Sequence, residues 1–149
     1  MRSFLTSVRT PAAVRDTGLL IGRALLGVVL IAHGLQKFND LGLDGVEAMF
    51  EKSGVPLPAL TAPAVAALEV GGGALLIAGL LTSLVSALVA LDMLGAWWFV
   101  HKDGGLFVSE GGWELVAMIG AAAVALAAVG AGRFSIDHAT SRLLRSSAV

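Results

Sequence analysis

Four apolar segments of about twenty residues constrain the fold of this chain more than any other feature of its sequence. They cover approximately residues 17–37, 62–81, 84–101 and 113–132. A helix of about 20 residues, rising about 1.5 Å per residue, crosses the hydrocarbon core of a bilayer. Apolar residues make up 56% of the chain and charged residues only 14%, well below the ~25% charged residues of soluble domains. The sequence therefore predicts an all-α integral membrane four-helix bundle, with residues 1–149 as a single domain.

Charged residues outside these segments predict the orientation of the bundle. The two tails carry most of the arginines, namely Arg2, Arg9, Arg15, Arg133, Arg142 and Arg145. The first long connection is instead acidic. Because cytoplasmic loops are enriched in Lys and Arg, both tails are expected in the cytoplasm and both longer connections outside, as a multi-pass N-in/C-in protein.

The first long connection is expected to contain a helix of its own. Val46, Met49 and Phe50 recur with the i, i+3, i+4 spacing of one helical face. This pattern predicts a short interfacial helix lying on the outer membrane surface. Pro56 and Pro58 should end it, because each proline disfavours helix in the preceding residue.

Ionisable residues interrupt the apolar segments themselves. Arg23, Glu69 and Asp92 lie well inside the first, second and third segments. A charge at this depth costs at least ~2.5–3.5 kcal/mol, so it is normally paired, neutralised or exposed to water. Counted along the helices, Arg23 and Asp92 lie about 9 Å and about 12 Å from the same end. We therefore expect an Arg23–Asp92 ion pair that holds the bundle together.

A second polar group is expected near the outer ends of the helices. Its members are His33, Lys37, Glu69, His101 and Glu114, with Trp97 and Trp113 beside them. Glu69 and His33 are predicted to form a proton-handling or ligand-binding pair, because a buried carboxyl beside an imidazole can exchange protons. The alternatives are a structural hydrogen bond for this pair, solvated or capping roles for His101 and Glu114, and an interfacial aromatic belt for the tryptophans.

Several classes of site are excluded or disfavoured by composition. The chain has no cysteine, which excludes disulfides, thiolate catalysis and Cys-ligated metal centres. No metal site is expected, because the histidines lack HxxH or HExxH spacing. The net charge of −1 and the absence of a basic stripe argue against nucleic-acid binding. Gly71-Gly72-Gly73 predicts a close approach between helices, since small residues let backbones meet.

Three motifs in order resemble those of the DoxX family of membrane proteins. They are His33-Gly34-Leu35-Gln36-Lys37, similar to its HGxxK motif, the glycine-rich segment 69–82, and Gly111–Leu115 followed by the GxGRxSxD-like stretch Gly130–Asp137. The resemblance extends over about residues 17–138. Ala131 stands where proline is frequent in the terminal motif, which affects only local geometry.

The resemblance implies a four-helix protein of the cytoplasmic (inner) membrane. Relatives in this family include a subunit of an archaeal thiosulfate:quinone oxidoreductase and an actinobacterial protein linked to a complex with superoxide dismutase and a sulfurtransferase. It thus implies a subunit of a redox or oxidative-stress complex, at most part of a quinone-linked oxidoreductase, with a quinone or a similar amphipathic molecule as ligand. The absence of cysteine puts thiol-based sulfur chemistry in this chain in doubt.

The expected partners are the lipid bilayer, soluble redox enzymes at the cytoplasmic face and a second copy of the chain. Two other functions fit the same sequence. One is a non-catalytic scaffold or assembly factor, for which the segment 38–60 and the basic tail would matter most. The other is a small transporter, which would need oligomerisation because four helices enclose little volume.

Overall fold

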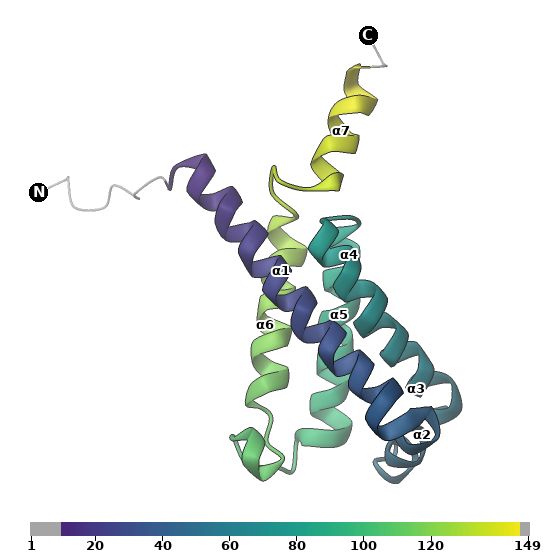
Figure 1. Ribbon diagram of the computed structural model, residues 1–149. Coiled ribbons are helices and arrows are strands. Elements are labelled where there is room, and N and C mark those ends of the chain that lie inside the picture. Colours follow the sequence, from purple (N-terminus) through teal and green to yellow (C-terminus); the bar gives the residue numbers. More distant parts are fainter. Residues whose placement is uncertain (1–9, 147–149) are drawn as a thin grey trace, which may run out of the picture.

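The computed structural model describes residues 10–146 and arranges them as a helical bundle without strands (Figure 1). Its α-helices are α1 (Ala12–Gln36), α2 (Gly42–Lys52), α3 (Pro58–Ala67), α4 (Gly73–Ala78), α5 (Thr82–Ala96), α6 (Glu114–Val129) and α7 (Ile136–Ser146). Three π-helical turns, Lys37–Leu41, Leu68–Gly72 and Trp97–His101, extend or join these helices, and Val108–Glu110 forms a short 3-10 turn. The predicted all-α membrane bundle is confirmed. Arg2 and Arg9, used above for orientation, lie outside the described residues.

Within residues 10–146, three helical runs are long and apolar enough to cross a membrane. They are Ala12–Lys52, Pro58–Ala78 and Thr82–His101, whereas α6 is a shorter apolar helix of 16 residues. At about 1.5 Å per residue, α6 spans about 24 Å. It ends at Val129 because Gly130 adopts a φ of 81°. The fourth span is thus shorter than the predicted segment 113–132.

The first helix begins earlier than the apolar pattern indicates. α1 starts at Ala12, directly after Pro11, and not near residue 17. The intervening residues contain no glycine or proline, so the helix continues outward past the apolar segment. This extension changes which residues lie at the same level in the bundle.

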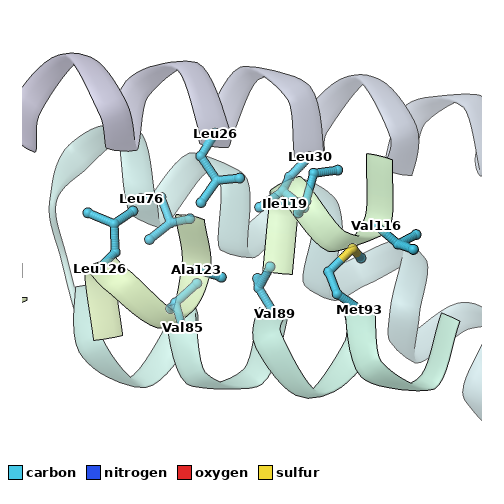
Figure 2. Packing of buried hydrophobic residues seen from close by; sticks show 10 residues of the cluster. All are labelled: Leu26, Leu30, Leu76, Val85, Val89, Met93, Val116, Ile119, Ala123 and Leu126. Atoms are coloured by element: carbon cyan, nitrogen blue, oxygen red, sulfur yellow. The ribbon is translucent and has the colours of Figure 1, made fainter. Parts of the chain in front are cut away.

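The core of the bundle is formed by apolar residues from four helices (Figure 2). They are Leu26 and Leu30 of α1, Leu76 of α4, Val85, Val89 and Met93 of α5, and Val116, Ile119, Ala123 and Leu126 of α6. On the outside, Leu25, Leu91 and Met118 are each more than 60% exposed. Large apolar side chains on both the inside and the outside are the pattern of a bundle surrounded by lipid.

Glycines set the closest contact between α1 and α4. A Cβ added to Gly27 would lie 2.5 Å from the carbonyl oxygen of Gly73, and one added to Gly73 would lie 2.6 Å from that of Gly27. The prediction that the glycine triplet permits close helix approach is thus confirmed for Gly73. It is wrong for Gly71, where an added Cβ would meet nothing within 4 Å.

The predicted short helix is present as α2, but its apolar face covers protein. Val46 is fully buried and Phe50 is 8% exposed, and both pack against Ala62 of α3. Met49 remains 38% exposed. Two of the three predicted membrane-facing residues therefore form a small second core that fixes α2 against the start of α3.

The two ends of the bundle differ in the segments that they carry (Figure 1). The start of α1, the α4–α5 turn and α7 lie at one end, which we call the tail end. The segment α2 and the connection 102–113 lie at the opposite end, which we call the loop end. This placement brings both described tail segments to the same end of the bundle.

Candidate functional site

Arg23 forms the centre of a polar contact at the tail end. Its side chain is 1% exposed. Its Nη1 donates to the carbonyl oxygens of Leu76, at 2.7 Å, and Ile77, and its Nη2 donates to the carbonyl oxygen of Phe134. These carbonyls belong to the C-terminal end of α4 and to the segment before α7. Arg23 therefore binds carbonyl oxygens at the C-terminal end of α4 and before α7, and the predicted Arg23–Asp92 ion pair does not form.

The reason for this error is the vertical offset between the helices. α1 starts well beyond the α4–α5 turn, so Arg23 reaches the level of Leu76 and of the beginning of α5. Asp92 lies ten residues after Thr82, the first residue of α5. At about 1.5 Å per residue this is about 15 Å further into the bundle. Counting residues from predicted segment ends therefore placed two distant side chains at the same depth.

Asp137 and Asp16 complete the tail-end contacts. The carboxylate of Asp137 accepts hydrogen bonds from the backbone N–H groups of Leu81, at 2.8 Å, and Thr82, at 2.9 Å. It thereby caps the start of α5 from a distant part of the chain. Asp16, only 2% exposed, accepts a hydrogen bond from the backbone N–H of Arg133 at 3.3 Å. Arg23, Asp137 and Asp16 thus form these polar contacts of the tail end.

A cavity of about 450 Å³ lies at the loop end. Its walls come from α1, α2, α3, α5 and α6 and from the three π-helical turns. The titratable residues in the wall are His33, Lys37, Glu69, Asp92 and His101, and apolar residues such as Leu30, Phe50, Val65, Phe99 and Ile119 form most of the rest. The structure thus brings together four of the residues predicted for the outer polar group and adds Asp92 to them.

Lys37 and Glu69 form a buried ion pair in the cavity wall. The Lys37 Nζ lies 2.8 Å from Oε1 and 2.6 Å from Oε2 of Glu69. The side chains are only 16% and 5% exposed. Each belongs to a π-helical turn, a feature that frequently marks functional sites because it displaces a side chain from regular helical register.

The histidines line the same cavity without contacting Glu69. His33 Nδ1 lies 2.9 Å from the carbonyl oxygen of Val29, one turn earlier in α1. His101 Nδ1 lies 2.9 Å from the carbonyl oxygen of Gly111. Since these bonds require a proton on Nδ1, the other ring nitrogen is an acceptor in the neutral imidazole. Glu69 therefore pairs with the longer side chain of Lys37, and the predicted Glu69–His33 hydrogen bond does not form.

The remaining predicted residues lie elsewhere. Glu114 Oε1 accepts a hydrogen bond from the backbone N–H of Val108 at 2.9 Å, so this carboxylate orders the loop before α6. Trp97 and Trp113 line a separate groove of about 1100 Å³ between α5 and α6, together with Lys102. They are 38% and 39% exposed, as expected for an aromatic belt at a membrane interface.

Sequence reasoning missed the lining role of Asp92 and the burial of Asp16. Asp137 enters the sequence analysis only as part of the GxGRxSxD-like stretch, and its capping of α5 depends on the tertiary contact. The π-helical turns give no sequence signal of this kind. Among residues 10–146, no group of three or more His, Asp or Glu side chains is placed to hold a metal ion.

Comparison with known proteins assigns the chain to a family. The family model DoxX matches residues 18–102, and these include every titratable residue of the cavity wall. The "Putative oxidoreductase CatD" of Bacillus subtilis is 38% identical over 81 residues, which cover 54% of this chain and 58% of that protein. The "Uncharacterized membrane protein Rv3486" of Mycobacterium tuberculosis is 30% identical over 135 residues, or 80% of this chain and 79% of that protein. No solved structure matches the chain at a significant level. The helical bundle, the motifs and these matches agree, and the chain is a membrane protein of the DoxX family.

Proposed function

We propose that this chain is a ligand-binding subunit of a redox complex in the cytoplasmic membrane and that a quinone, or a similar amphipathic molecule, occupies the loop-end cavity. The observation that carries the proposal is a largely apolar cavity whose wall contains the Lys37–Glu69 ion pair and Asp92. Ionisable groups inside membrane-spanning helices are expensive to maintain and commonly mark functional sites. The relative from Bacillus subtilis carries the name "Putative oxidoreductase CatD", and this name supports the redox assignment.

The size and chemistry of the cavity fit such a ligand. Small-molecule sites typically have volumes of about 300–1,000 Å³, mostly apolar walls and a few converging polar groups. The cavity of about 450 Å³ satisfies these conditions. An isoprenoid or alkyl tail would lie along apolar side chains, and a ring carbonyl would accept hydrogen bonds from wall groups such as the Lys37 ammonium.

Within this proposal the chain binds and orients the ligand. Reduction of a quinone to a quinol takes two electrons and two protons. The electrons come from a partner oxidoreductase, and the protons come from water by way of titratable side chains of the wall. His101 and His33 line the cavity and are the proposed relays, because a neutral imidazole donates from one ring nitrogen and accepts at the other.

The tail end is the proposed site of contact with soluble redox enzymes. Arg133, Arg142 and Arg145 lie there, and because cytoplasmic segments are enriched in Lys and Arg we propose that this end faces the cytoplasm. The loop end with its cavity then opens toward the outer half of the membrane.

Binding of a quinone to the purified protein in lipid nanodiscs tests the proposal. Calorimetric titration with decyl-ubiquinone and with menaquinone-4 should show saturable binding to the wild-type protein. In the double variant Lys37→Gln/Glu69→Gln, which removes both charges together, the affinity should fall at least about tenfold, which corresponds to about 1.4 kcal/mol.

The matched control is Glu51→Gln/Lys52→Gln. These two residues are exposed on α2, outside the cavity wall, and carry the same pair of charges. Their removal should leave the affinity unchanged within about twofold. Equal losses in both double variants, or wild-type protein that binds neither quinone, would refute the cavity as the ligand site. The latter result, together with loss of partner binding after removal of α7, would favour the scaffold function.

A further inference from the structure

Asp92 is a residue of the cavity wall with a buried carboxyl oxygen that binds no other group of the described residues. It lies in the middle of α5 and lines the cavity. Its Oδ2 is buried and has no hydrogen-bond partner within the part of the chain that the structure describes. The other buried atoms of this kind among residues 10–146 belong to Arg23, Thr82 and Ser86, none of which lines the cavity. Leaving a buried polar atom without a hydrogen bond costs free energy, so a ligand that hydrogen-bonds to Asp92 would remove this cost.

The other charged groups of the wall do not neutralise Asp92. Lys37 and Glu69 both act on it electrostatically, but the Lys37 ammonium binds both oxygens of Glu69 at 2.8 Å and 2.6 Å. The two histidines have their Nδ1 atoms bound to backbone carbonyls. The lining residues from α2, α3 and α6 carry no ionisable side chain. The wall thus holds two carboxyl groups and a single lysine, and that lysine is already paired.

This imbalance restricts the ligand. An anion in the cavity would exchange water for a largely apolar wall whose one lysine is already bound to Glu69, and burying a charge without a partner is costly. An uncharged hydrogen-bond acceptor meets no such cost. A carboxyl group that carries a proton is itself neutral and offers one O–H donor.

We propose that the loop-end cavity selects an uncharged ligand and that Asp92, in its protonated form, donates a hydrogen bond to a carbonyl oxygen of that ligand. This inference rests on the proposed function and adds to it the charge of the ligand and the residue that donates a hydrogen bond to its carbonyl oxygen. Asp92 is then a specificity-determining residue, and the Lys37–Glu69 pair, in which the two charges already bind each other, leaves no free cation in the described part of the wall for an anion.

The pH dependence of binding tests the role of Asp92. We would titrate wild-type protein in nanodiscs with 1,4-naphthoquinone at several pH values from mildly acidic to mildly alkaline. The affinity should fall as the pH rises, because the donor proton leaves Asp92. Asp92→Asn keeps a donor that does not titrate, so its affinity should stay within about threefold of the acidic wild-type value and should not fall with pH. Asp92→Leu has no donor and should bind at least about tenfold more weakly at every pH.

A second arm tests the charge of the ligand. 1,4-Naphthoquinone-2-sulfonate has the same ring system with one negative charge, and it should bind wild-type protein at least about tenfold more weakly than the parent quinone. Equal binding of the two compounds would overturn the charge selection. If Asp92→Asn followed the same falling pH profile as the wild type, or if Asp92→Leu bound as tightly as the wild type, Asp92 would not be the donor.

Unfolding of Asp92→Leu would not prevent a decision, because Asp92→Asn is nearly isosteric and its pH profile alone separates the two outcomes. The failure of the proposed function has a different signature. Wild-type protein that binds no quinone at any pH would overturn the proposed function and this inference together, whereas quinone binding that is insensitive to Asp92 would overturn this inference alone.

Discussion

Charged side chains at the two ends of the bundle find partners of different kinds. At the tail end, Arg23 and Asp137 bind backbone groups of α4, α5 and the segment before α7. The space between these groups is filled, since even a Cβ on Gly79 would lie 2.6 Å from that of Ser135. At the loop end, Lys37 and Glu69 bind each other beside a cavity of about 450 Å³, and Asp92 Oδ2 has no partner.

This difference shows how a structural charge is distinguished from a functional one inside a membrane. A charged side chain that hydrogen-bonds to carbonyl or N–H groups at helix ends offsets the free-energy cost of burying both itself and those backbone groups. A charged side chain in the wall of a cavity can still form hydrogen bonds to a molecule that enters the cavity. We therefore expect substitutions at the tail end to reduce stability and substitutions at the loop end to act chiefly on ligand binding.

The largest effect is expected for Arg23→Leu. It removes the Arg23 donors to the carbonyl oxygens of Leu76, Ile77 and Phe134, of which Leu76 keeps the backbone N–H of Gly79 as a donor at 3.1 Å. The free energy of unfolding should fall by about 3–5 kcal/mol. Denaturant unfolding in detergent micelles, followed by circular dichroism, measures this change.

The matched control is Asp92→Asn, which should change the free energy of unfolding by less than about 1 kcal/mol because no hydrogen bond of Asp92 Oδ2 is lost. Comparable destabilisation by both variants would mean that Arg23 and Asp92 depend on each other, and the contrast between the two ends would no longer hold.

A smaller but still large effect is expected for Gly79→Ala. Gly79 adopts a φ of 69°, and an added Cβ would lie 2.6 Å from Ser135 Cβ and 2.8 Å from Arg23 Nη1. Backbone strain and overpacking together should lower the free energy of unfolding by about 2–4 kcal/mol. In Gly71→Ala, the same change into open space should cost less than about 1 kcal/mol. If Gly79→Ala and Gly71→Ala changed the free energy of unfolding equally, the tail end would be less tightly filled than these contacts indicate.

The smallest effect is expected for the coupling between Lys37 and Glu69. A double-mutant cycle of Lys37→Gln and Glu69→Gln on the free energy of unfolding should give a coupling of about 1–2 kcal/mol, because residues in contact are not additive. Each single variant leaves a buried charge without its partner, whereas the double variant leaves none. If the changes in unfolding free energy of the two single variants were strictly additive, the ion pair at the loop end would be contradicted.

Much of the fold could be predicted because the membrane imposes it. Apolar segments long enough to cross a bilayer and the spacing of Val46, Met49 and Phe50 correctly indicated the helices. The prolines were expected to end α2, but this helix ends earlier, at Lys52, and Pro58 is the first residue of α3. The side on which α2 buries its apolar face could not be predicted, because an amphipathic helix satisfies that face equally well on lipid or on protein.

The candidate site was predicted only in part. His33, Lys37, Glu69 and His101 line one cavity, but the partner of Glu69 and the position of Asp92 were wrong in the sequence analysis. Both errors have one cause. A hydrophobic segment specifies that a helix crosses the membrane but not its tilt or its offset along its neighbours, which depend on packing.

The sequence by itself determined that the chain is a bundle of membrane-spanning helices with a few charges that need compensation, because hydrophobic length and the cost of buried charge are local properties of each segment. Only the tertiary structure decided which charge meets which partner. The extended start of α1 and the glycine contact between Gly27 and Gly73 set the offset of α1 against α4. That offset places Arg23 among backbone carbonyls and leaves Asp92 in the wall of a cavity.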